Sequence, residues 1–179
     1  MQRTRRFALP VVLAIAALAG CVPANPSVTT VPSVDIARYA GLWYEVSSVK
    51  QFFSVGLVNT TATYTVRPDG NVGVLNRGRY FGPQGLESSI QGAAVPVDST
   101  NSRLNVGFGA TPTNQGMGNY WIIDLDPDYQ WAAVSDPSGT SFFLLSRTKS
   151  MDPVLKAAIL ARAEAKGVNI AGTTDTPQF

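Results

Sequence analysis

The chain has 179 residues, enough for one domain with a sizeable core, and only 15% of them are charged. Its 16 glycines and 12 prolines favour a turn-rich β protein over a helical bundle. No basic run occurs in the body of the chain, which argues against a nucleic-acid partner, and the absence of histidine removes the commonest general base and metal ligand.

The first twenty residues are typical of an export signal. Three arginines precede an apolar stretch over residues 7–17, which is too short to span a bilayer. The segment ends in Leu18-Ala19-Gly20-Cys21, which is similar to the bacterial lipobox, where the cysteine is acylated, for example with palmitate, and becomes the first mature residue. We therefore predict a signal peptide over residues 1–20 and lipidation of Cys21. A chance cysteine after an ordinary signal peptide is the alternative.

The segment after Cys21 is expected to be a tether. Residues 22–34 contain three prolines and no charge. Removing the three leader arginines from 14 Lys and Arg leaves 11, against 12 Asp and Glu, so the mature chain is nearly neutral. We predict that residues 21–34 hold a domain of residues 35–179 close to a bacterial membrane, either the outer membrane or the outer face of the cytoplasmic membrane. With one cysteine, the chain has no internal disulfide.

The body of the chain alternates apolar and polar residues in short runs separated by glycine, proline and aspartate turns. Eight consecutive antiparallel strands can close up-and-down into a barrel that is just wide enough for packed side chains or one small ligand. A two-sheet sandwich is the competing architecture, but it would need longer crossovers than these connections of about two to eight residues. The predicted strands are residues 42–49, 57–66, 72–80, 86–97, 103–108, 119–125, 129–135 and 141–147.

The first strand follows a short turn over residues 35–39 and begins with Gly41-Leu42-Trp43. The glycine permits a sharp bend, and the indole is large enough to close one end of a narrow barrel. For Gly41-Leu42-Trp43 taken alone, the simpler interpretation is that Trp43 is one more core aromatic residue.

The pattern changes to helix after residue 147. Asp152 can cap the helix, Pro153 suits its first position and Gly167 stands where it stops. These signals predict a helix of about fourteen residues on the outer wall of the barrel. A short ninth strand is expected near residues 170–174.

Three segments in this order resemble the lipocalin family, and within it the bacterial lipocalins, which are lipoproteins similar to apolipoprotein D. The middle segment departs from the family pattern at Leu125 and Pro127. The resemblance covers about residues 34–172 and implies an all-β, eight-stranded up-and-down barrel with the C-terminal helix packed outside. It also implies that Arg147 lies across Trp43 at the closed end. The segments are Gly41-Leu42-Trp43-Tyr44-Glu45-Val46, Asp124-Leu125-Asp126-Pro127-Asp128-Tyr129 and Phe142-Phe143-Leu144-Leu145-Ser146-Arg147-Thr148.

Strand parity, combined with this alignment, predicts the lining of the barrel. If Arg147 points inward, so do Leu145 and Phe143, which leaves Phe142 and Leu144 for the helix side. Glu45 is expected either to add polarity inside or to lie on the surface. The remaining inward residues are expected to be Ala62, Tyr64, Val74, Asn76, Leu104, Val106, Phe108, Tyr120, Ala132 and Val134.

Small residues in the strands predict a hollow interior, because they leave volume that a ligand would occupy. They are Gly73, Gly78, Gly92, Ala93, Ala94, Gly107, Ala132 and Ala133. The ligand contacts expected from the lining are Tyr64, Asn76, Val106, Phe108, Tyr120, Val134 and Phe143.

These observations predict a membrane-anchored protein that binds or carries a small hydrophobic ligand, such as a fatty acid or lysophospholipid, at the cell envelope. No catalytic residue, cofactor or metal is predicted, since no serine has an obvious base nearby and the Asp124, Asp126 and Asp128 run lacks the glutamate and turn glycine of a calcium loop. The alternatives are a stress-associated surface scaffold with a filled barrel, acting through loops such as residues 109–118, and a lipocalin-fold enzyme.

Overall fold

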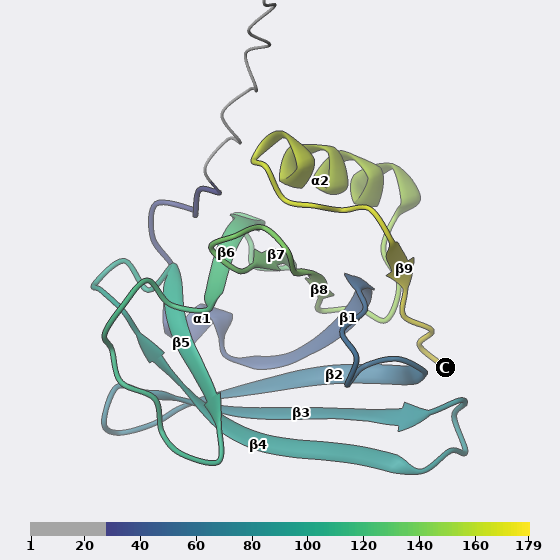
Figure 1. Cartoon of the computed structure of the whole chain (residues 1–179), viewed down its shortest axis with the longest axis horizontal. Coiled ribbons are helices and arrows are strands. Elements are labelled where there is room, and N and C mark those ends of the chain that lie inside the picture. Colours follow the sequence, from purple (N-terminus) through teal and green to yellow (C-terminus); the bar gives the residue numbers. More distant parts are fainter. Residues whose placement is uncertain (1–27) are drawn as a thin grey trace, which may run out of the picture.

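The computed structural model describes residues 28–179, and their strands wrap into a ring (Figure 1). The predicted signal peptide and Cys21 lie outside the described residues. In chain order the elements are α1 (Ile36–Tyr39), β1 (Gly41–Val49), β2 (Leu57–Val66), β3 (Val72–Tyr80), β4 (Glu87–Pro96), β5 (Arg103–Phe108), β6 (Tyr120–Leu125), β7 (Trp131–Ser135), β8 (Phe142–Ser146), α2 (Pro153–Ala165) and β9 (Thr173–Asp175).

The ring closes because β1 pairs antiparallel with both β8 and β2, while every other neighbour in the ring is also the neighbour in sequence. This order confirms the predicted up-and-down barrel and excludes the sandwich. All eight predicted strands are present. Strand β7 begins at Trp131 rather than at residue 129, because Tyr129 has a φ of 60° and belongs to the preceding turn. The ninth strand pairs with β1 outside the ring.

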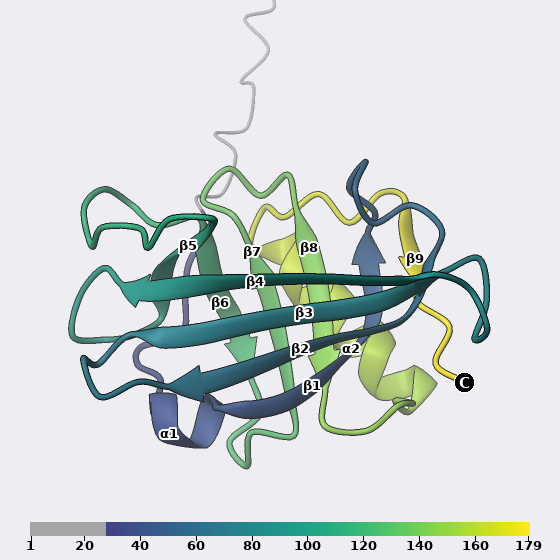
Figure 2. The ribbon, with the colours of Figure 1, turned by 90° about the horizontal axis from the view of Figure 1, so that it is seen from below.

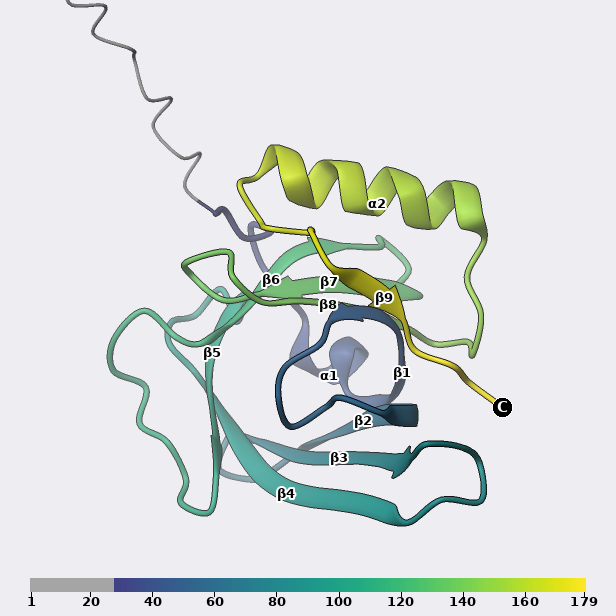
Figure 3. The ribbon, with the colours of Figure 1, turned by 45° about the vertical axis from the view of Figure 1, so that its right-hand side comes forward.

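Residues 36–39 form one helical turn, α1, rather than the simple turn expected there. The Asp35 carboxylate accepts hydrogen bonds from the backbone N–H groups of Ala37 and Arg38, at 2.9 and 3.2 Å, and so caps the turn. Figure 3 looks into the ring of strands, and α1 is visible within it. The helix therefore covers one end of the barrel, called here the closed end, and brings Tyr39 into the interior.

Helix α2 packs against the outside of the barrel, as predicted (Figure 3). The Asp152 carboxylate accepts a hydrogen bond from Leu155 N–H at 2.9 Å, and proline stands in the first turn. Ile159 and Ala163 are buried against Phe142 and Leu144 in a cluster beneath the helix. Within the described residues, no helix is long and apolar enough to cross a membrane.

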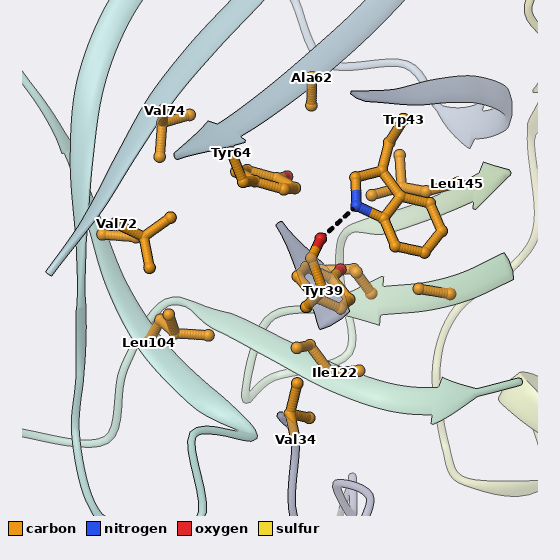
Figure 4. Close-up of a cluster of buried hydrophobic side chains, with 13 residues drawn as sticks. Val34, Tyr39, Trp43, Ala62, Tyr64, Val72, Val74, Leu104, Ile122 and Leu145 are labelled. Carbon is orange, nitrogen blue, oxygen red and sulfur yellow. Dashed lines mark hydrogen bonds between the residues drawn. The ribbon is translucent and has the colours of Figure 1, made fainter. Parts of the chain in front are cut away.

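The strands separate two apolar clusters. The inner cluster surrounds Trp43 and contains Leu145 (Figure 4). Phe143 packs against this cluster. Phe142 and Leu144 belong instead to the outer cluster beneath α2. Strand β8 therefore alternates between the interior and the helix side, which confirms the predicted parity.

The closed end is held by Arg147, whose guanidinium carbon lies 3.7 Å from the centre of the Trp43 ring. Its Nη1 donates to the Leu42 carbonyl at 2.7 Å, and its Nη2 donates to the carbonyls of Arg38 and Ala40, both at 2.9 Å. The indole Nε1 donates to the Tyr39 carbonyl at 2.8 Å. One cation thus joins the end of β8 to α1 and the start of β1, which is the contact that the family resemblance implies.

Gly41 makes this contact possible. Its φ of +98° is a conformation that residues with a side chain rarely adopt, and a Cβ at this position would lie 3.3 Å from Arg147 Nη1. The glycine of the motif therefore gives both the bend into β1 and the space for the guanidinium.

We predict that Arg147→Met lowers the free energy of unfolding by on the order of 3 kcal/mol, because it removes the cation–π contact and leaves several carbonyls without their donor. Arg147→Lys should recover only part of the loss, since an ammonium lacks the planar fork. Urea titration measures both effects, with Arg77→Met on the exposed outer face of β3 as the matched control. Equal midpoints for Arg147→Met and the control would contradict the structural role assigned to Arg147.

Candidate functional site

Three tyrosines from different elements meet at the floor of the interior. The hydroxyl of Tyr120, on β6, lies 2.8 Å from that of Tyr39 on α1 and 3.0 Å from that of Tyr64 on β2. The rings of Tyr39 and Tyr64 stack with their centres 5.6 Å apart. Figure 4 shows Tyr39 and Tyr64 side by side next to Trp43. The floor is therefore aromatic, with a short chain of hydroxyl groups inside it.

Burial makes these phenols hard to ionise. Burial raises the pKa of Tyr64 to about 12, although the hydrogen bond with Tyr120 acts in the opposite direction. Burial, followed by the nearby Tyr64, raises the pKa of Tyr39 well above 10, and burial followed by Tyr39 does the same for Tyr120. At neutral pH the floor therefore carries hydrogen-bonding groups without charge.

The hollow interior predicted from small residues is wrong for the lower half of the barrel. The cavity there has a volume of about 20 Å³, roughly the space of one water molecule. The phenols of Tyr39, Tyr64 and Tyr120 line it together with Val72 and Leu104.

Several of the small residues cannot create interior space because they face outward. Ala93 is paired with Gly73 and Gly107, while the neighbouring positions Ala94 and Val106 belong to or contact the inner cluster. Since successive side chains in a strand point to opposite faces, Gly73, Ala93 and Gly107 lie on the outer face. Ala133 belongs to the cluster beneath α2.

The other half of the barrel, towards the open end, is accessible. Ala62 is in the inner cluster and pairs with Asn76, which pairs with Ile90, so these side chains share the interior face. Ile90 is nevertheless 48% exposed, and Phe108, at the end of β5, is 45% exposed. Apolar side chains on the interior face are therefore accessible from the open end, above the tyrosine floor.

Two buried polar atoms in this half lack partners. Neither Thr60 Oγ1 nor Asn76 Oδ1 has a hydrogen-bond partner within residues 28–179, although both atoms are buried. Most buried polar groups in folded proteins are paired, so these two unpaired atoms are unusual.

The predicted contact residues divide between floor and mouth. Tyr64 and Val134 are buried in the inner cluster, and Val106, Tyr120 and Phe143 pack against it. Phe108 lies instead at the mouth of the barrel. Its ring is so close to Gly92 that a Cβ on Gly92 would be 2.7 Å from it.

Sequence reasoning missed Tyr39, Thr60 and Ile90. The available signal for Tyr39 was its position four residues before Trp43, which places it beside the indole once α1 forms.

Glu45 is buried and forms an ion pair with Lys50. Its Oε1 accepts hydrogen bonds from Lys50 Nζ at 2.6 Å and from the Ser48 hydroxyl at 2.8 Å. The C-terminal tail covers this position, since the Gln178 amide donates to the carbonyls of Glu45 and Thr60, both at 2.9 Å. The tail therefore closes the seam between the upper parts of β1 and β2.

The acidic residues between β6 and β7 form an ion pair and hydrogen bonds that stabilise the fold. Asp124 pairs with Arg162 of α2 at 2.7 Å. Asp126 accepts hydrogen bonds from the backbone N–H groups of Asp128 and Gln130, both at 3.1 Å. Within the described residues, no group of three or more acidic or cysteine side chains is arranged to hold a metal ion.

An eight-stranded antiparallel barrel with one covered end, an open apolar mouth and an external helix defines a class of small-ligand barrels. A profile of the Lipocalin-like domain matches residues 34–178. The chain belongs to the lipocalin family, as its three sequence motifs indicated.

Comparison with individual proteins agrees with this assignment. The chain is 33% identical over 168 residues to the outer membrane lipoprotein Blc of Escherichia coli, with 90% of this chain and 92% of that protein covered. It is 35% identical over 154 residues to temperature-induced lipocalin-1 of Arabidopsis thaliana, covering 83% of this chain and 81% of the plant protein. Among solved structures, the cockroach allergen Per a 4 has a TM-score of 0.61 at 17% identity, covering 86% of this chain and 96% of that one, which shows the fold.

We predict that three of the six tyrosines ionise only well above pH 10 in the folded protein. Because the folded-state pKa of Tyr64 is about 12, above the ordinary value of 10.0, its contribution to stability is complete below pH 10 and is lost as the pH rises towards 12. This loss amounts to about 3 kcal/mol for Tyr64. Ultraviolet absorbance of tyrosinate and urea titrations at rising pH measure the two effects.

The denaturant-unfolded chain is the control for this titration, since all its tyrosines should ionise together near pH 10. If the folded protein gave the same single transition while its fold stayed intact, the buried phenol cluster would be contradicted.

Proposed function

We propose that the protein binds one lipid, a fatty acid or a lysophospholipid, in the open half of its barrel. The observation that carries the proposal is the exposed interior face at Ile90 and Phe108, directly above a floor that is already filled. An acyl chain that packs against this face is removed from water. The free energy of this transfer is favourable by about 0.8 kcal/mol per methylene group. Binding therefore needs no covalent chemistry and no strong polar contact.

The unpaired atoms of Thr60 and Asn76 favour a ligand that also carries a polar group. A hydroxyl group, such as that of a lysophospholipid glycerol, can donate to Asn76 Oδ1 and accept from the Thr60 hydroxyl. A fatty-acid carboxylate can instead accept from the Thr60 hydroxyl and, after a flip of the amide, from Asn76 Nδ2, so the site suits either lipid class. The expected ligand contacts from floor to rim are Tyr64, Tyr120, Val134, Phe143, Val106, Asn76 and Phe108.

The proposal includes an anchor at the cell envelope. It is supported by the lipobox-like sequence that ends at Cys21, by the uncharged segment that follows, and by the similarity to bacterial outer membrane lipoproteins. The anchor and the barrel together suit a protein that takes lipid from, or delivers it to, a membrane beside it.

We predict that Val106→Trp weakens binding of a fluorescent fatty acid at least about tenfold, because Val106 lies on the interior face between the filled floor and Phe108. The matched control is Leu75→Trp on β3, which is paired with Gln91 and faces outward. Displacement of the probe by lysophosphatidylcholine measures the affinity. Unchanged binding in Val106→Trp, with the fold intact, would place the ligand outside the barrel.

We predict that Cys21→Ser moves the exported protein from the membrane fraction to the soluble fraction, since the serine cannot carry the thioether-linked diacylglycerol. Immunoblots of separated membrane and soluble fractions measure the change, with Ser27→Ala in the same uncharged segment as the control. A Cys21→Ser protein that still resisted extraction by carbonate would contradict the acyl anchor, while leaving lipid binding by the barrel open to its own test.

A further inference from the structure

The loops at the open end expose large apolar side chains. Because the strands alternate in direction, the connections that follow β1, β3, β5 and β7 all lie at the end opposite α1. In the β1–β2 loop Phe52 is 91% and Phe53 is 58% exposed, and in the β3–β4 loop Phe81 is 86% and Leu86 is 78% exposed. These four residues are called the apolar rim. Exposed apolar groups of this kind commonly mark an interaction surface.

The rim is one surface rather than two separate loops. The backbone N–H of Phe81 donates to the Gly56 carbonyl at 2.8 Å, which ties the β3–β4 loop to the β1–β2 loop. The Phe81 ring lies so close to Gly56 that a Cβ there would be 2.4 Å from a ring carbon. The rings of Phe52 and Phe53 meet edge to face with centres 5.3 Å apart. The structure therefore holds the phenylalanines in fixed loops at the mouth.

The loops at the open end carry little charge. The four loops there, residues 50–56, 81–86, 109–118 and 136–140, contain only Lys50 and Asp136 as charged residues. Lys50 is paired with Glu45 at 2.6 Å, and Asp136 accepts hydrogen bonds from Ser138 and Ser141 beside it.

Charged residues occur instead in the connections at the closed end. The two charged residues next to the apolar rim form an ion pair with each other. Arg79 and Glu87, which flank the β3–β4 loop, lie 3.0 Å apart. The closed-end connections carry Arg67, Asp69, Asp98, Asp126 and Asp128. An aromatic end with little charge, opposite a charged one, has the polarity expected of a surface that meets lipid.

The described chain begins at this same end. Val28 lies against the β7–β8 loop, where a Cβ on Gly139 would be 3.1 Å from its side chain. From there the chain runs along β6 towards the closed end, with Val31 N–H bonded to the Ile122 carbonyl at 2.9 Å. In Figure 2 the β7–β8 and β1–β2 loops share the upper edge of the molecule. Cys21 is seven residues before Val28, a span of at most about 25 Å.

We propose that the apolar rim docks on the interface of a lipid bilayer, so that the mouth of the barrel faces the membrane. Phe and Leu side chains enter the boundary between headgroups and acyl chains, while the loop backbone stays among the headgroups, where its polar groups are satisfied. The orientation rests on the proposed anchor at Cys21, but the surface itself does not depend on what the barrel binds. Lipid could then pass between bilayer and barrel without crossing bulk water.

The experiment places an environment-sensitive dye at either end of the mature protein, purified from bacterial membranes and reconstituted into phosphatidylcholine vesicles. Gln84→Cys puts it in the β3–β4 loop, and Asp128→Cys puts it in an exposed turn at the closed end. The dye at residue 84 should shift to apolar emission and become roughly tenfold less accessible to a water-soluble quencher, because the bilayer interface excludes it. The dye at residue 128 should remain fully accessible.

Rim variants test whether the rim causes this protection. Phe52→Ser combined with Phe81→Ser should restore quencher access at residue 84, while Leu42→Ser combined with Val66→Ser, which changes two exposed apolar residues near the closed end, should not. Fatty-acid binding by each variant shows that the barrel is intact. Equal quenching at residues 84 and 128 would overturn the proposal.

Two further outcomes are distinguishable. Protection at residue 84 that grows with protein concentration in the absence of vesicles would show that a second copy covers the rim, which also overturns the bilayer proposal. Dye uptake by the unmutated chain would show that its single cysteine, Cys21, is free. That result would refute the proposed anchor and the orientation built on it, whatever the lipid-binding result.

Discussion

The stacking of the Arg147 guanidinium on Trp43 is the contact on which the rest of the molecule depends. It joins the end of the last strand of the ring to the start of the first strand and to α1, so it holds α1 over one end of the barrel. The indole is fully buried, and its own N–H is bonded to Tyr39. Closure of this end gives the barrel a single mouth.

Covering one end decides where a ligand can lie. Helix α1, held by this contact, brings Tyr39 inside, and the three phenols fill the space that the strands alone would leave. The remaining apolar interior is the half above them, where Ile90 and Phe108 are exposed. The same end carries the weakly charged loops and the start of the described chain, so the proposed ligand entry, membrane contact and tether would all lie on one face of the protein.

The sequence was informative where a short-range pattern determines structure. The alternating runs and turn residues predicted the bounds of the strands to within two residues. The capping residues Asp152 and Pro153 predicted the start of α2. The contact of Arg147 with Trp43 could be expected only through the family resemblance, because 104 residues separate the two and no local pattern connects them. Parity correctly divided β8 between the interior and the helix side.

The filling of the interior could not be predicted from strand patterns. The alternation of side chains along a strand predicts the face toward which each side chain points, but not how much of the interior it fills. Tyr39 in addition comes from a helical turn, to which this alternation does not apply. Gly73, Ala93 and Gly107 suggested free volume, but their positions in the register place them on the outer face. The apolar rim was equally hidden, since Phe52 and Phe81 are separated in sequence and become neighbours in one surface only when the β1–β2 and β3–β4 loops meet.

The most direct measurement is a crystal structure of the protein with bound lysophosphatidylcholine. The account predicts an acyl chain in the upper half of the barrel, against Ile90 and Phe108, with a polar group of the lipid near Asn76 and with Arg147 still stacked on Trp43. Lipid bound to the outer face beneath α2, or a barrel that takes up lipid only by separating Arg147 from Trp43, would contradict it.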